Sequence, residues 1–182
     1  MQGAAEERAG GAEPAQAVSR FRSPSPESTR SLGAALARAG DESGLVVALV
    51  GALGAGKTVF VKGLAAGLGL DPARVASPTF VIASEYGRSA RGGSRLAHLD
   101  LYRVARPEEL EAAGFVDLLA RSGLVAIEWG ERFPEALPPD VLWVRLRRPE
   151  GPASEMEREI EMEARGPLAA RVLERLERMR WA

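Results

Sequence analysis

Residues 51–58 have the types and the spacing of a phosphate-binding loop. They read G-A-L-G-A-G-K-T and match the pattern G-x-x-x-x-G-K-[ST] at every fixed position. In such a loop, successive backbone N–H groups point into a concavity that holds phosphate oxygens, and the following helix adds the positive end of its dipole. Lys57 would place its ammonium on the β- and γ-phosphates, and the hydroxyl of Thr58 would ligate Mg²⁺. The sequence therefore predicts a site for a nucleoside triphosphate with magnesium.

Glycine is needed at several points of this loop. Gly51, Gly54 and Gly56 permit a backbone geometry and a close approach to phosphate that a Cβ would block. The alternative interpretation is a glycine-rich turn that carries an exposed lysine. We favour the phosphate-binding loop, because it follows an apolar run, precedes a predicted helix and holds Lys57, one of only two lysines in the chain.

Two carboxylates come directly after apolar runs. Asp100 follows residues 96–99, and Glu128 follows residues 124–127. Because α/β sheets bind ligands at the carboxyl ends of their parallel strands, we expect both acids near the loop, where either could hold Mg²⁺ or orient an attacking water. The alternative for each is a solvated carboxylate at a strand end. For His98, two residues before Asp100, we favour a hydrogen-bonded structural role over that of a catalytic base.

The composition excludes several other kinds of site. The chain has 182 residues, no cysteine and one histidine, which excludes disulfides, cysteine-ligated zinc, iron–sulfur clusters and multi-histidine metal sites. A formal net charge of -1 argues against a protein that coats nucleic acid by bulk charge. We find no signal-peptide pattern and no apolar run near the ~20 residues of a membrane span, so we expect a cytoplasmic protein without membrane contact.

The elements that must position these residues follow an alternating pattern of strands and helices. Buried strands are predicted at residues 45–50, 124–127 and 141–146, a hairpin at 81–86 and 95–101, and an edge strand at 157–164; helices are predicted from about 26 to 40, after the loop, at 107–121 with an interruption at Gly114, and at 167–180. This pattern indicates a three-layer α/β domain of the P-loop NTPase type, with a mainly parallel central sheet and an antiparallel hairpin. We place this single domain at residues 25–182 and expect residues 1–24 to be a disordered tail.

Several short strings resemble the TsaE (YjeE) family, the small P-loop ATPases that bacteria need to make threonylcarbamoyladenosine in tRNA. In chain order they are Thr29 with Leu32-Gly33, the loop at 51–58, S-P-T-F at 77–80, Glu85-Tyr86, H-L-D-L-Y-R at 98–103 and I-E-W at 127–129. The loop is generic, whereas S-P-T-F, H-x-D-x-Y-R and I-E-W in this order are specific. The resemblance covers roughly residues 25 to 165.

The resemblance implies a site for ATP and Mg²⁺. Thr58 and Glu128 resemble the magnesium ligands of the family, and Asp100 resembles the acid needed for hydrolysis, although which of the two acids touches the metal directly stays open. Residues 54–59, which include Ala55 and Val59, would wrap the phosphates. We therefore expect Lys57, Asp100 and Glu128 to be catalytic, and Thr58, Glu128 and Asp100 to lie at the metal.

The resemblance also implies further contacts with the nucleotide, because certain residues stand at matching positions in the family pattern. Trp129 resembles the aromatic residue beside the nucleotide, and Thr79 resembles the hydroxyl of a switch-type loop that faces the γ-phosphate. Thr29 and Arg158 resemble positions near the adenine. Two residues depart from the family pattern: Ala52 stands where an acid is usual, and Val59 stands where Ser or Thr is common, so a hydroxyl contact is absent there.

The resemblance also implies partners. The family acts with TsaB- and TsaD-type proteins of the threonylcarbamoyl transfer complex, on tRNAs that read codons beginning with A, and an indirect or transient contact with tRNA is a further expectation. In this hypothesis, ATP binding and hydrolysis reset the assembly and do not supply the acyl chemistry. The alternatives are a small-molecule kinase on the same scaffold and a nucleotide-gated binding module with negligible turnover.

Overall fold

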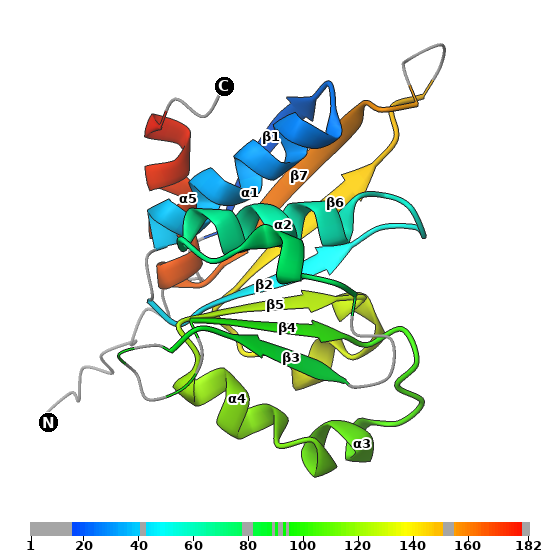
Figure 1. Cartoon of the computed structure of the whole chain (residues 1–182), viewed down its shortest axis with the longest axis vertical. Coiled ribbons are helices and arrows are strands. Elements are labelled where there is room, and N and C mark those ends of the chain that lie inside the picture. Colours follow the sequence, from blue (N-terminus) through cyan, green and yellow to red (C-terminus); the bar gives the residue numbers. More distant parts are fainter. Residues whose placement is uncertain are drawn as a thin grey trace, which may run out of the picture.

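A mixed β-sheet forms the centre of the computed structural model, which describes residues 16–40, 43–77, 82–88, 90, 93, 95–150 and 155–179 (Figure 1). Within these residues the strands are β1 (Gln16–Ser23), β2 (Leu45–Val50), β3 (Ala83–Tyr86), β4 (Leu96–Asp100), β5 (Leu124–Glu128), β6 (Val141–Arg147) and β7 (Arg158–Arg165). Their order across the sheet is β1-β7-β6-β2-β5-β4-β3. The strands β6, β2, β5 and β4 are parallel, and β3, β7 and β1 add antiparallel pairs at both sides.

Helices cover the two faces of the sheet. The helices are α1 (Pro26–Gly40), α2 (Lys57–Gly67), α3 (Pro107–Ala112), α4 (Phe115–Arg121) and α5 (Pro167–Arg178), with short 3₁₀ turns at Pro72–Arg74, Gly130–Arg132 and Pro134–Ala136. Alternate residues of β2 show the division: Val47 packs in one core with α1, α2 and α5, whereas Val46 packs in the other with α3 and α4. The predicted three-layer α/β fold, with a parallel core and a hairpin of β3 and β4, is confirmed (Figure 1).

The helix α2 is held against α1 at unusually short range. A Cβ on Gly33 of α1 would lie 2.4 Å from the carbonyl oxygen of Phe60, and a Cβ on Gly63 of α2 would lie 2.2 Å from that of Arg30. Glycine at these two positions therefore lets the backbones approach where any side chain would collide. This contact fixes α2, and with it the end of the loop that precedes α2.

The strand β1 corrects the predicted disordered tail. Residues 16–23 pair antiparallel with β7, so the sheet begins before residue 25; residues 1–15 lie outside the described part of the chain. Ala17 and Phe21 pack against the core, whereas the residues between and beside them, Val18, Arg20 and Arg22, lie on the opposite face of the strand. The prediction of a disordered tail was wrong for residues 16–23, because a single strand with one buried face has few apolar residues and so resembles a disordered segment in the sequence. The strand β7 is consequently an inner strand, not the predicted edge.

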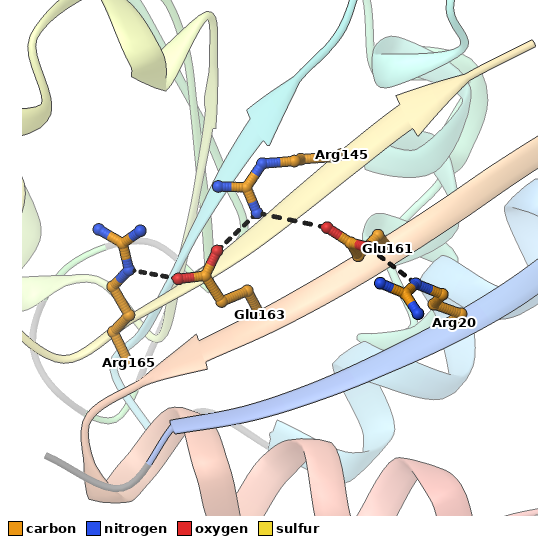
Figure 2. Close-up of polar contacts among 5 residues, drawn as sticks. All are labelled: Arg20, Arg145, Glu161, Glu163 and Arg165. Atoms are coloured by element: carbon orange, nitrogen blue, oxygen red, sulfur yellow. Dashed lines mark hydrogen bonds and ion pairs between the residues drawn. The ribbon is translucent and has the colours of Figure 1, made fainter.

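Ion pairs cross the uncovered face of β1, β7 and β6 (Figure 2). Arg20 binds Glu161 at 2.9 Å, and Glu163 lies 2.7 Å from both Arg145 and Arg165. Burial opposes ionisation of Glu163, but hydrogen bonds from Arg165 and Arg145 outweigh it and hold the pKa of this carboxyl below its usual value. The exposed pair of Arg20 and Glu161 contributes only about 0–1 kcal/mol. Pairs between neighbouring strands place opposite charges beside each other, which supports the strand register.

The helix α5 depends on a cap from a distant residue. The N-cap residue Gly166, just before the helix, offers no side chain, and the carboxylate of Asp140 instead accepts hydrogen bonds from the N–H groups of Leu168 at 2.8 Å and Ala169 at 2.9 Å. We expect Asp140→Ala to lower the free energy of unfolding by about 1–2 kcal/mol, because two N–H groups lose their acceptor. Urea unfolding measures this, with Asp140→Asn as the milder control. Equal stability of Asp140→Ala and the natural chain would contradict the capping role.

Within the described residues, no helix combines the length and the apolar character that crossing a membrane requires.

Candidate functional site

The glycine-rich loop lies between β2 and α2, as predicted. The strand β2 is an apolar run buried between two helical layers, and α2 begins at Lys57. Gly51 has φ 150°, Gly54 has φ 76° and Gly56 has φ 104°, which are values that favour glycine. At Gly51 the space is closed as well, because a Cβ would lie 2.4 Å from the carbonyl oxygen of Leu146. The loop therefore favours glycine for its backbone conformation at all three positions, and at Gly51 for close packing as well.

A cavity of about 720 Å³ opens over this loop. It lies at the carboxyl ends of the parallel strands, where Asp100 of β4 is in register with Glu128 of β5. From the loop and the start of α2 its lining includes residues 53–59, and from other elements it includes Ser77, Asp100, Tyr102, Glu128 and Trp129. The structure thus brings the two predicted acids and the predicted aromatic residue to one cavity with the loop, Ala55 and Val59 included.

The ammonium of Lys57 rests on the loop itself. It donates to the carbonyl oxygens of Gly51 at 2.6 Å and Ala52 at 3.2 Å, and lies 3.9 Å from the centre of the Trp129 ring. Burial lowers the pKa of Lys57, and the negative charges of Glu128 and nearby acids oppose this effect only in part. An ammonium held by neutral carbonyls in a desolvated place gains strongly from an anion, since opposite charges attract more at low dielectric.

The hydroxyl of Thr58 and the carboxylate of Glu128 lie side by side and offer oxygen atoms that could hold a metal ion. Thr58 Oγ1 donates to Glu128 Oε1 at 2.8 Å, and Nε2 of His98 lies 3.0 Å from the same oxygen. His98 is fully buried and forms the predicted hydrogen bond, whereas its structural rather than catalytic role stays a prediction. In the described residues, no group of three or more His, Asp and Glu side chains gathers to hold a metal ion. As a general rule, Mg²⁺ takes one or two protein carboxylates and completes its shell with phosphate and water.

Asp100 is held at both of its oxygens. Ser77 Oγ donates to Oδ2 at 2.7 Å, and the N–H of Tyr102 donates to Oδ1 at 2.9 Å. Sequence reasoning missed the contact from Ser77, although this residue opens the S-P-T-F string that pointed to the site. Thr79 of that string lies outside the described residues, so its contact with the γ-phosphate stays a prediction.

Trp129 closes one side of the cavity in a rare backbone conformation. It is the one non-glycine residue with positive φ in the described part of the chain, at 62°, and its N–H donates to the carbonyl of Leu49 at 3.0 Å. Its ring lies 5.0 Å from that of Tyr102 at an interplanar angle of 42°. This strained turn directs the indole toward Lys57, and nothing in the sequence signals it.

Thr29 and Arg158, the two residues predicted to lie near the adenine, do not line the cavity. The hydroxyl of Thr29 is buried in α1 and lies 2.7 Å from Oγ of Ser23. Arg158, at the start of β7, donates from Nε to the carbonyl of Ala55 at 2.8 Å. Burial lowers the pKa of Arg158, and the positive charge of Arg148 adds to this effect. Contacts of Thr29 and Arg158 with a nucleotide base therefore stay predictions.

Comparisons with known proteins agree on one family. The sequence model described as "Threonylcarbamoyl adenosine biosynthesis protein TsaE" matches residues 23–160. The tRNA threonylcarbamoyladenosine biosynthesis protein TsaE of Bacillus subtilis is 37% identical over 162 residues, which cover 87% of this chain and 94% of that protein. The protein of the same name from Treponema pallidum is 43% identical over 106 residues, covering 58% and 75%. The crystal structure of Bacillus subtilis YdiB superposes with a TM-score of 0.67 at 29% identity, covering 90% and 97% of the two chains.

Proposed function

The chain belongs to the TsaE family, and on this premise we propose that it binds and hydrolyses ATP in the biosynthesis of threonylcarbamoyladenosine in tRNA. The observation that carries the proposal is the cavity itself. It combines a phosphate-binding loop, the desolvated ammonium of Lys57 and the oxygen pair of Thr58 and Glu128. These groups meet the three needs of a magnesium-bound triphosphate: backbone donors, a positive charge and oxygen ligands for the metal.

Each side chain has a distinct proposed role. Lys57 would exchange its contacts with two loop carbonyls for phosphate oxygens. Thr58 and Glu128 would hold Mg²⁺, which when bound draws negative charge from the transferred phosphoryl group. Asp100 lies in the same cavity and would accept a hydrogen bond from the attacking water, which orients it for in-line attack. Trp129 and Tyr102 would limit the access of other water to this place.

The proposed partners are those of the family pathway. The chain would act with TsaB- and TsaD-type proteins on tRNAs that read codons beginning with A, and nucleotide binding and hydrolysis would reset that assembly between turnovers. The acyl transfer itself would take place on the partner proteins. Contact of this chain with tRNA would be indirect or transient, which fits the near-zero net charge of -1.

A reconstituted reaction tests this proposal. Multiple-turnover modification of tRNA is measured with the partner proteins, with the chain present or absent, while released inorganic phosphate is followed in parallel. We expect sustained product formation and phosphate release only when the chain is present. The variant Arg20→Met, altered at an ion pair of β1 outside the cavity lining, should give the same product formation and phosphate release as the natural chain. Equal product with and without the chain would refute the role, and transfer of phosphate to a small alcohol in place of water would indicate a kinase.

A further inference from the structure

Arg158 is bonded to the outer side of the phosphate-binding loop. Its Nε donates to the carbonyl of Ala55 at 2.8 Å, and its Nη2 donates to that of Gly54 at 3.1 Å. The remaining guanidinium nitrogen, Nη1, donates to the carbonyls of Glu155 at 2.7 Å and Glu157 at 2.6 Å. One planar fork thus ties the start of β7 to two consecutive peptide groups of the loop, more than 100 positions away in the sequence.

These bonds set the direction of the peptide groups. Because a trans peptide is planar, its C=O and N–H point in opposite directions. The carbonyl of Ala55 faces Arg158, so the N–H of Gly56 points away from Arg158. Gly56 itself lines the cavity. The next peptide toward the N-terminus is held at both ends, since the carbonyl of Gly54 meets Arg158 and the N–H of Ala55 donates to Ala52 at 3.0 Å.

The loop needs such a restraint because of its own composition. Gly54 and Gly56 have positive φ, and glycine at these positions has many other conformations of similar energy. At Gly54 nothing lies within 4 Å of where a Cβ would be, so packing of neighbouring atoms does not fix that position. The loop would lose conformational entropy when an anion binds, unless it already holds the bound shape. The charged guanidinium of Arg158, bonded to the carbonyls of Ala55 and Gly54, supplies that restraint.

We propose that Arg158 is a positioning residue, which fixes the backbone of residues 54–56 so that the N–H of Gly56 is ready for phosphate. This inference rests on the proposed function, since it concerns the binding of a nucleotide by the loop. It assigns to Arg158 a role in the affinity for any polyphosphate, regardless of the base attached.

The test compares ATP with inorganic tripolyphosphate, which has no base. Calorimetric titrations at one ionic strength use the natural chain, Arg158→Met, Arg158→Lys and the control Arg20→Met, which removes an arginine of the edge strand β1 that pairs with Glu161 and does not bond to the loop. We expect Arg158→Met to weaken the binding of both ligands by the same factor, about 10-fold. Arg158→Lys keeps the charge but not the fork, so it should remain weaker than the natural chain for both ligands. Arg20→Met should bind both ligands normally.

Other outcomes have definite meanings. A loss that affects ATP and spares tripolyphosphate would overturn the inference and indicate a contact with the base. Unchanged binding by Arg158→Met, or full recovery in Arg158→Lys, would overturn it too, since the fork would then be unnecessary. If Arg158→Met does not fold, the comparison of Arg158→Lys with the natural chain decides. Failure of the natural chain to bind either ligand would contradict the proposed function, which is a separate result.

Discussion

Replacing Lys57 by alanine should abolish tight binding of ATP. The ammonium of Lys57 is buried and held by two loop carbonyls, so in the bound state it would form charge-assisted contacts with phosphate at low dielectric. Contacts of this kind are worth about 1.5–3 kcal/mol, which corresponds to a loss of roughly 10- to 150-fold in affinity. Isothermal titration with ATP in the presence of Mg²⁺ measures the loss directly.

Two variants separate the charge from the packing at this position. Lys57→Met keeps most of the aliphatic stem beside Trp129 and removes the charge, so we expect it to bind ATP as poorly as Lys57→Ala. Lys62→Met removes the other lysine, which lies on the same helix α2, and should bind normally. Affinity of Lys57→Met equal to that of the natural chain would show that the ammonium does not meet the triphosphate.

Changes at Thr58 and Glu128 should act through magnesium. We expect Thr58→Ala and Glu128→Gln to reduce Mg²⁺-dependent turnover by roughly 100-fold or more, because Thr58→Ala removes an oxygen ligand and Glu128→Gln removes the negative charge of the other one. Changes in the outer shell of a metal site already cost about 10- to 100-fold. Binding of ATP without Mg²⁺ should change little. The measurement is turnover and ATP affinity over a range of Mg²⁺ concentrations.

The choice of Glu128→Gln keeps the fold intact. The carboxylate accepts from Thr58 at 2.8 Å and lies 3.0 Å from Nε2 of His98, and an amide can still form hydrogen bonds in both directions. Alanine would leave the buried His98 without this partner and mix a loss of stability with the loss of the metal. If both variants turned over ATP with the natural dependence on Mg²⁺, the assignment of the metal to this pair would be wrong.

Local patterns in the sequence predicted the centre of the molecule. The apolar run of β2 followed by glycines and Lys57 predicted the strand, the loop and the helix, because each is determined by residues adjacent in the chain. The parallel register of β4 and β5 then places Asp100 beside Glu128 at one edge, as the positions of the two acids after apolar runs predicted. The shared cavity follows from that topology.

Contacts between distant segments were not predictable from such patterns. The strand β1 pairs with β7, which lies more than 130 positions further along, and its polar residues gave no local sign of a partner. The left-handed backbone of Trp129 and the bonds of Arg158 to loop carbonyls depend on the assembled structure. A guanidinium that binds backbone carbonyls has no sequence partner to identify it, because every residue offers the same group.

The central claim is that the cavity over residues 51–58 holds the triphosphate of ATP, and a crystal structure with a non-hydrolysable ATP analogue and Mg²⁺ tests it most directly. We expect the phosphates on the loop, the ammonium of Lys57 moved from the carbonyls of Gly51 and Ala52 onto phosphate oxygens, and the metal at Thr58 and Glu128. A structure at saturating analogue in which Lys57 still binds those two carbonyls, with the analogue bound elsewhere or absent, would contradict the account.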